Sequence, residues 1–272
     1  LLQRQEIALL DVREEDPFAQ CHPLFAANMP LGRIEADAWT RVPRLDTFVV
    51  VYGTSFNGDD LALPAARTLK RMGYTQVHLL DGGLAGWQAA GGEVFRDVNV
   101  PSKSFGELVE SKRHTPSLSA QEVKALIDAQ ADVVVMDARR FDEYQTMSIP
   151  TGVSVPGAEL VLRARALAPN PTTRIIVNCA GRTRSIIGTQ SLINAGIPNP
   201  VSALRNGTIG WTLAGQELVT GAQQRFPDID DATRQKAAAT ALAVAYRAGV
   251  KRVRLDELHT WLADATRTTY FF

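Results

Sequence analysis

Short apolar runs and amphipathic stretches follow one another along the chain in two series. Residues 48–52 and 175–178 form continuous runs of the kind expected for strands buried on both faces of a parallel sheet. Each run leads into a turn and then a helical stretch, at 61–72 and 185–194, and Gly73 or Gly196 follows at a C-cap position. A further strand is predicted after each glycine, at 76–80 and 201–204. The pattern indicates strands that alternate with helices.

The two series also match in residues. Leu9-Leu10-Asp11-Val12-Arg13 recurs 126 residues later as Val135-Met136-Asp137-Ala138-Arg139, and the segment 80–87 (LDGGLAGW) recurs 124 residues later as 204–211 (LRNGTIGW). Because the two offsets nearly agree, the sequence predicts two copies of one α/β fold. Each copy is expected to be an open, mostly parallel sheet with helices on both faces.

These repeats define the predicted domains. The first spans 1–97, a polar and weakly periodic segment at 98–117 is expected to be a linker, and the second domain spans 118–220. The second domain opens on a predicted helix with Ser119 as N-cap and Glu122 at the third position. In the tail, 221–272, residues 255–262 followed by 268–272 resemble 119–127 followed by 133–136. The tail is therefore interpreted either as the start of a third copy in a longer chain or as an accessory helix packing on the second domain.

The amino-acid composition argues against several classes of function. Lys plus Arg and Asp plus Glu both number 29, so the net charge gives no reason to expect a nucleic acid or membrane partner. No apolar run approaches the roughly 18 to 20 residues that cross a bilayer, and the two cysteines are too few for a disulfide framework. We therefore expect a soluble, cytoplasmic protein. The four histidines have no metal-ligand spacing, and no metal is expected.

Cys179 is the best candidate for chemistry. It ends a predicted buried strand and begins a loop that leads into a helix, where loop N–H groups and the positive helix end favour an anionic sulfur. Gly181 is expected to relieve the steric limits of a tight loop, and two arginines add positive charge for an anionic donor. The loop consists of Cys179, Ala180, Gly181, Arg182, Thr183 and Arg184.

Taken together, the Asp-x-Arg strand end at 137–139, the 179–184 loop and the 206–211 segment resemble the rhodanese, or sulfurtransferase, family. The resemblance implies ping-pong transfer of a sulfane sulfur from a small donor such as thiosulfate, through a Cys179 persulfide, to cyanide or a thiol. It implies no cofactor, and a protein acceptor is an alternative. By this resemblance the backbone of 180–184 cradles the sulfur, and Arg182 and Arg184 bind the donor. Asp137 and Arg139 brace the loop, as a structural ion pair, and Trp211 is interpreted as core.

The first domain departs from this pattern at the decisive position. Aligning the strands at 49–52 and 175–178 places Gly53 opposite Cys179, and the following loop, 53–60, is acidic where the other is basic. The first domain is therefore expected to be catalytically inactive. Cys21 lies elsewhere and is interpreted as structural, with a resolving thiol as the alternative.

Two rival functions remain open from sequence. Cell-cycle dual-specificity phosphatases share this fold and also place a cysteine before a helix, so phosphatase or arsenate chemistry is an alternative. Their motif has five residues between Cys and Arg, whereas four separate Cys179 from Arg184. The other rival is a non-catalytic regulatory module that binds a partner.

Overall fold

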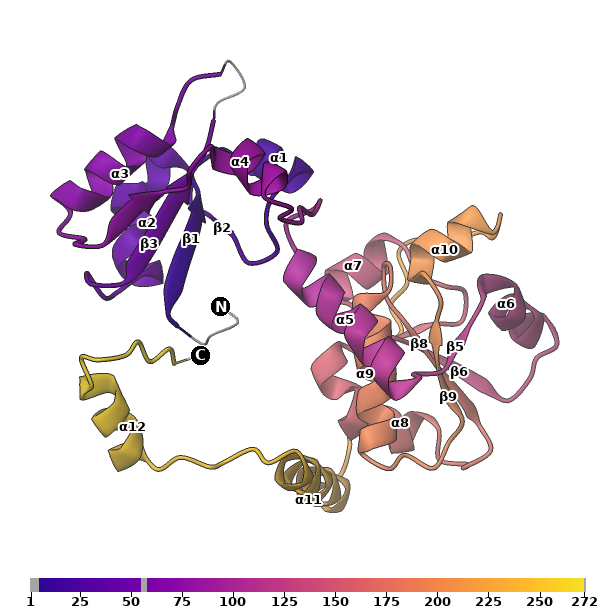
Figure 1. Ribbon diagram of the computed structural model, residues 1–272. Coiled ribbons are helices and arrows are strands. Elements are labelled where there is room, and N and C mark those ends of the chain that lie inside the picture. Colours follow the sequence, from indigo (N-terminus) through magenta and orange to yellow (C-terminus); the bar gives the residue numbers. More distant parts are fainter. Residues whose placement is uncertain (1–4, 55–57, 272) are drawn as a thin grey trace. The chain divides into compact units, whose positions relative to one another are not determined.

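The computed structural model describes residues 5–54 and 58–271. The chain divides into two compact units, of which unit 1 comprises Leu1–Pro101 and Arg252–Phe272 and unit 2 comprises Ser102–Lys251 (Figure 1). Each unit contains a parallel sheet with helices packed against it, which confirms the predicted α/β class.

Unit 1 is built on a four-stranded sheet of order β2-β1-β3-β4. Its strands and helices include β1 (Ile7–Asp11), α1 (Glu15–Gln20), β2 (Ala27–Asn28), the 3-10 turn η1 (Leu31–Arg33), α2 (Ile34–Arg41), β3 (Phe48–Tyr52), α3 (Ala62–Arg71), β4 (Val77–Leu79), α4 (Gly83–Ala89) and α12 (Leu255–Ala263).

Unit 2 is built on a five-stranded sheet of order β5-β9-β8-β6-β7. Its elements include β5 (Ser117–Leu118), α6 (Ala120–Asp128), β6 (Val133–Asp137), α7 (Phe141–Thr146), β7 (Val153–Ser154), η2 (Gly157–Glu159), α8 (Leu160–Leu167), β8 (Arg174–Asn178), α9 (Thr183–Asn194), β9 (Val201–Leu204), α10 (Gly207–Leu213) and α11 (Asp231–Arg247).

The strand registers place the two Asp-x-Arg motifs at equivalent strand ends. Asp11 pairs with Tyr52 at the end of β1 and β3, and Asp137 pairs with Asn178 at the end of β6 and β8. The predicted helix ends are also correct in kind, since Gly73 and Gly196 follow α3 and α9 with positive φ angles. The Ser119 capping box with Glu122 is present at the start of α6.

Alternation along the strands gives unit 2 apolar packing on both faces of its sheet. Met136, Ile175 and Val177 pack with buried residues of α8 and α9, whereas Val135 and Ile176 pack with buried residues of α6 and α10. Burial on both faces explains why β8 reads as a continuous apolar run. This two-sided packing holds the carboxyl end of β8, where Cys179 follows, in a fixed place.

The segment 98–117 differs from the predicted linker. Residues Val100–Arg113 form the helix α5, and unit 2 already begins at Ser102, within its first turn. Helix α5 has few buried side chains, but Gly106 is buried against Thr183 at the start of α9. Helix α5 therefore contacts the loop through its backbone and its charged side chains rather than through an apolar stripe. For this reason hydrophobic periodicity does not reveal the helix.

The tail divides between the two units. Residues up to Lys251, including α11, belong to unit 2, and the segment from Arg252 belongs to unit 1. There the Thr268 hydroxyl donates to Glu6, and the Tyr270 hydroxyl donates to the Arg41 carbonyl at 3.0 Å. Helix α11 of the tail thus packs on the second domain, against α8, as one of the two interpretations expects, whereas α12 groups with unit 1. Residue 272, the last of the segment predicted to resemble a strand, lies outside the described residues.

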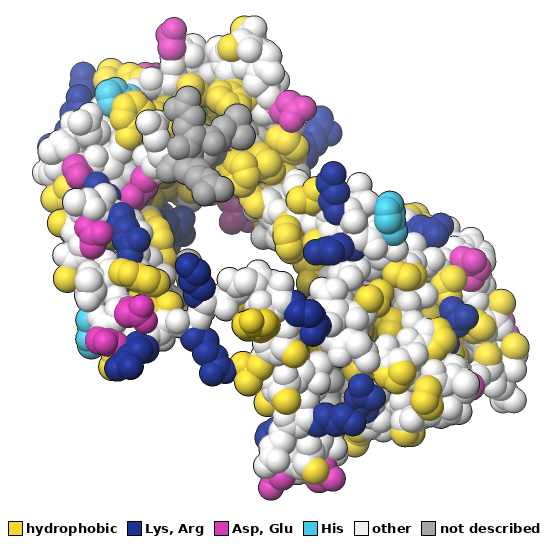
Figure 2. All heavy atoms as spheres, turned by 60° about the horizontal axis from the view of Figure 1, so that its bottom comes forward, with side chains coloured by type: hydrophobic (Ala, Val, Ile, Leu, Met, Phe, Trp, Pro, Cys, Tyr) yellow, Lys and Arg dark blue, Asp and Glu magenta, His cyan; other side chains and the backbone are white. Residues whose placement is uncertain are grey.

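Charged and hydrophobic side chains are interspersed on the face shown in Figure 2, in keeping with the equal numbers of acidic and basic residues. Across 5–54 and 58–271, no helix has the length and apolar character needed to cross a membrane.

Candidate active site around Cys179

Cys179 follows directly on β8, a central strand of the unit 2 sheet, and only 2% of the residue is exposed. Its thiol donates to the Ser185 hydroxyl at 3.5 Å, and that hydroxyl donates to the Arg182 carbonyl at 2.8 Å. Helix α9 starts at Thr183, so its first N–H groups, which have no partner within a helix, face the loop. The sulfur thus lies where anionic charge is favoured. Ser185 was not singled out from sequence, where it marked only the beginning of a helix.

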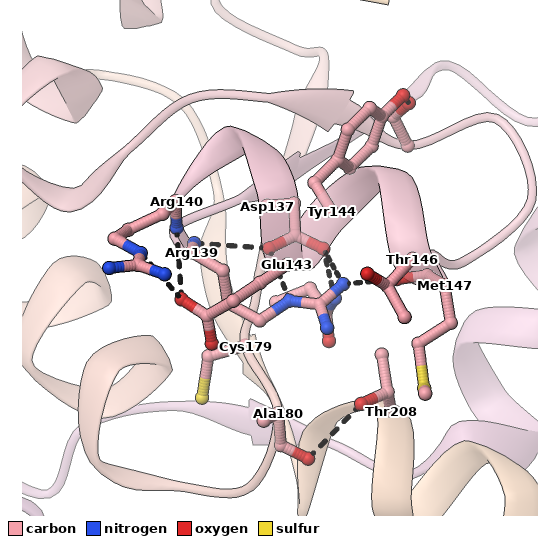
Figure 3. A network of polar contacts seen from close by, with 12 residues as sticks. Asp137, Arg139, Arg140, Glu143, Tyr144, Thr146, Met147, Cys179, Ala180 and Thr208 are labelled. Carbon is pink, nitrogen blue, oxygen red and sulfur yellow. Dashed lines mark hydrogen bonds and ion pairs between the residues drawn. The ribbon is translucent and has the colours of Figure 1, made fainter. Parts of the chain in front are cut away.

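The loop carbonyls are held from the other side by α10. The Thr208 amide donates to the Cys179 carbonyl at 2.9 Å, and the Ile209 amide donates to the Ala180 carbonyl at 3.0 Å. The Thr208 hydroxyl also donates to the Ala180 carbonyl, at 3.3 Å (Figure 3). With both carbonyls bound to α10, the path of the loop around the sulfur is fixed.

Gly207 permits this close approach. A Cβ at position 207 would lie 2.1 Å from the Cys179 carbonyl oxygen, and the backbone there has a φ of +54°. The role predicted for Gly181 is wrong by the same test, since a Cβ at 181 would meet no atom within 4 Å and its φ is not positive. The essential glycine of the loop therefore lies on the helix that supports it. The sequence signal was present, because Gly207 belongs to the repeated segment at 204–211.

Asp137 lies at the centre of a buried polar network at the end of β6 (Figure 3). Its carboxylate accepts from the Arg139 guanidinium at 2.9 and 2.7 Å and from the Asn178 side-chain amide at 2.8 Å. The Arg139 guanidinium also donates to the Met147 carbonyl at 2.6 Å. Asp137 and Arg139 form the structural ion pair expected from sequence, and Asn178 connects it to the residue just before Cys179.

The two loop arginines are both paired with carboxylates. Arg182 forms ion pairs with Glu107, at 2.7 Å, and with Glu110, both on α5. Arg184 binds Glu143 on α7 at 2.7 and 2.8 Å. The hydrogen bond from Arg184 lowers the pKa of Glu143 to about 2 and in turn the Glu143 carboxylate raises the pKa of Arg184. The positive charge predicted for this loop is therefore present but largely compensated.

A cleft of about 310 Å³ opens beside the loop. Gly181, Arg182 and Thr183 form part of its wall, so the structure brings these predicted residues together at one surface. The remaining lining comes from α5 and from the segment that includes α10: Lys103, Glu107, Asn206, Ile209 and Leu213. Ile209 and Leu213 are 57% and 81% exposed, which makes this side of the cleft apolar.

Among the residues that the structure describes, the equivalent place in unit 1 is built differently. Gly53 follows Tyr52 as Cys179 follows Asn178, and a Cβ at 53 would lie 2.8 Å from Val12 Cγ2. The Gly53 carbonyl accepts from the Leu61 amide at 3.1 Å, and a Cβ at Gly83, the counterpart of Gly207, would meet no atom within 4 Å. The described part of unit 1 therefore has neither a thiol at the strand end nor a close contact between the glycine at position 83 and the loop. Residues 55–57 of the acidic loop lie outside the described residues.

Two further residues lie as expected from sequence. Trp211 is fully buried in the core of unit 2, and its indole N–H donates to the Glu217 carbonyl at 2.8 Å, which confirms it as a packing residue. The Cys21 carbonyl accepts from Arg13 at 2.7 Å, as the Met147 carbonyl does from Arg139. Cys21 therefore has a place in the backbone support of unit 1, while its use as a resolving thiol stays a prediction.

Known proteins match this architecture. Residues 1–90 and 119–214 match the family described as rhodanese-like domain. The crystal structure of a thiosulfate sulfurtransferase from Pseudomonas aeruginosa is 67% identical, with a TM-score of 0.92, and the match covers 99% of this chain and 51% of that one. The chain thus spans about half the length of that protein. A candidate sulfur carrier protein of Bacillus subtilis (strain 168), YrkF, is 22% identical over 168 residues, 55% of this chain and 89% of its own. The chain therefore belongs to the rhodanese family and carries two rhodanese-like domains.

Proposed function

We propose that unit 2 is a sulfurtransferase in which Cys179 carries the sulfur as a persulfide. The observation that carries this proposal is the place of the thiol: it lies at the carboxyl end of β8, inside a loop bound by α10 and facing the start of α9. A loop closed this tightly around one side chain suits a single added sulfur atom.

The first half-reaction needs only the thiolate and a donor. The Cys179 thiolate attacks the sulfane sulfur of thiosulfate, the sulfur–sulfur bond of the donor breaks, and sulfite leaves with the bonding electrons. The product is the Cys179 persulfide anion. Its terminal sulfur is stabilised by the N–H groups at the start of α9 and by the positive end of the helix dipole.

The second half-reaction restores the enzyme. Cyanide or a thiolate attacks the terminal sulfur, the sulfur–sulfur bond to Cys179 breaks, and the Cys179 thiolate is released. The products are thiocyanate or a new persulfide. We assign the approach of the acceptor to the cleft beside Gly181 and Arg182, because these residues belong to the same loop as Cys179. A protein thiol is a second acceptor, supported by the likeness to the candidate sulfur carrier of Bacillus subtilis.

Unit 1 has no part in this chemistry in our proposal. Gly53 supplies no thiol, and Val12 occupies the space that a side chain there would need. We also propose a cytoplasmic setting, which the two free cysteines support because a reducing compartment preserves thiols.

Intact-protein mass spectrometry after incubation with thiosulfate tests the proposal. The wild type is expected to gain the mass of one sulfur atom, and the Cys179→Ser variant is expected to gain none. Cys21→Ser is the matched control, and it should gain sulfur like the wild type. An adduct that persists in Cys179→Ser would overturn the assignment, and the absence of any adduct would turn attention to an aryl-phosphate assay.

A further inference from the structure

Helix α5 delivers two carboxylates to the active-site loop. Gly106 makes this possible, because a Cβ there would lie 3.1 Å from Thr183 Cγ2 and 3.2 Å from Thr183 Cα. The backbone of α5 therefore touches the first residue of α9. Glu107 and Glu110 follow Gly106 on the helix, and both bind the Arg182 guanidinium, Glu107 at Nε and Nη2 and Glu110 at Nη2.

The second loop arginine is compensated in the same way from α7. Arg184 binds both carboxylate oxygens of Glu143, whose pKa of about 2 keeps it ionised at any working pH. The two arginines next to Cys179 thus face three carboxylates. Arg182 and Glu107 line the cleft together with Lys103, so three cations and three carboxylates lie around the loop and a dianion meets no net positive charge from these six groups. At Arg182 it must compete with Glu107 and Glu110 for the guanidinium.

The other wall of the cleft favours a different kind of molecule. Ile209 and Leu213 lie one helical turn apart on α10, and both expose apolar surface to the cleft. An organic donor with one negative charge would place its apolar group there and would repel the glutamates less than thiosulfate does.

We propose that Glu107 and Glu110 are specificity-determining residues, which make the site disfavour dianionic sulfur donors relative to donors of lower charge. The inference rests on the sulfurtransferase function proposed above. An organic thiosulfonate is a fitting monoanionic donor: the Cys179 thiolate attacks its sulfane sulfur, the sulfur–sulfur bond breaks, and a sulfinate leaves with the bonding electrons. Charge and atoms balance as they do with thiosulfate.

The test compares thiosulfate with benzenethiosulfonate as donors to the wild type and to the Glu107→Gln/Glu110→Gln double variant. The measured quantity is the second-order rate constant of persulfide formation at low ionic strength. For thiosulfate we expect an increase of about three- to tenfold in the variant, the size expected for two partly exposed ion pairs. Because electrostatic energy scales with charge, the logarithm of the increase should be about half as large for the monoanion.

The control variant Glu217→Gln/Asp231→Asn removes two negative charges at exposed positions elsewhere in unit 2. It should change neither rate constant. The increase for thiosulfate should also shrink as salt is added, because screening weakens interactions between partly exposed charges. Equal increases for both donors, or no increase for thiosulfate, would overturn the inference while leaving persulfide formation intact. No persulfide in the wild type from either donor would overturn the proposed function as well.

Discussion

Replacing Gly207 with Ala should damage both stability and sulfur transfer. The new Cβ would lie 2.1 Å from the Cys179 carbonyl oxygen, so α10 or the loop has to move. A left-handed backbone costs a non-glycine residue about 1 to 2 kcal/mol, and forcing an extra carbon into a packed site costs about 1 to 3 kcal/mol more. We expect a loss of roughly 2 to 5 kcal/mol in the free energy of unfolding of unit 2.

Gly83→Ala is the matched control for this change. Gly83 occupies the corresponding position of unit 1 with a φ of +55°, but a Cβ there meets no atom within 4 Å. The control therefore carries the backbone cost alone, about 1 to 2 kcal/mol, and leaves Cys179 untouched. The difference between the two variants isolates the contact between α10 and the active-site loop.

Two assays check the prediction. Urea unfolding of each variant gives the free-energy loss, and the rate of Cys179 persulfide formation by mass spectrometry gives the functional loss. A displacement of about 1 Å in a catalytic loop can reduce the rate by about a hundredfold, so we expect a large drop for Gly207→Ala and none for Gly83→Ala. Equal stability losses in the two variants, together with an unchanged transfer rate, would refute the role assigned to α10.

Two other predictions follow from single contacts. Gly53→Cys should not create a second sulfur carrier, because its Cβ would lie 2.8 Å from Val12 Cγ2; in a variant that also lacks Cys179, any sulfur adduct at position 53 would contradict this. Glu143→Gln should reduce stability at neutral pH. The pKa of Glu143 is lowered from 4.5 to about 2 by Arg184, so the pair contributes stability above about pH 4.5 that is lost as the pH falls through 2. Unfolding free energies of wild type and variant should therefore converge over this window, and a constant difference would contradict the pair's contribution.

Local pattern was enough to predict the central strand, helix and strand of both domains. The strands at 48–52 and 201–204 have the bounds that the apolar runs indicate. Gly73 follows the end of α3 and Gly196 follows the end of α9, as expected. These features depend on near neighbours in the chain, on periodicity, caps and turn residues. The repeat of the Asp-x-Arg motif added the domain number, since two equal patterns require two equal folds.

The sequence shows how many charged residues the loop contains, but not which distant residues form ion pairs with them. From sequence, Arg182 and Arg184 are expected to attract an anion. Their carboxylate partners on α5 and α7 are 41 to 75 residues away along the chain, so the sequence does not show that their charge is compensated. The segment that forms α5 was interpreted as a linker for the same reason. Its helix contacts the loop through Gly106 and two glutamates, which leave no apolar periodicity to detect.

The sequence by itself determined the fold class, the two copies and the position of Cys179 at the end of a buried strand, because each depends on residues close together in the chain. Tertiary structure alone decided which glycine the active-site loop requires and how its charge is compensated. The loop sequence predicts that Gly181 is the required glycine. In the structure it is Gly207, because a Cβ there would clash with the Cys179 carbonyl, against which α10 packs only after folding. Close approach between distant segments is a property of packing, and no local pattern encodes it.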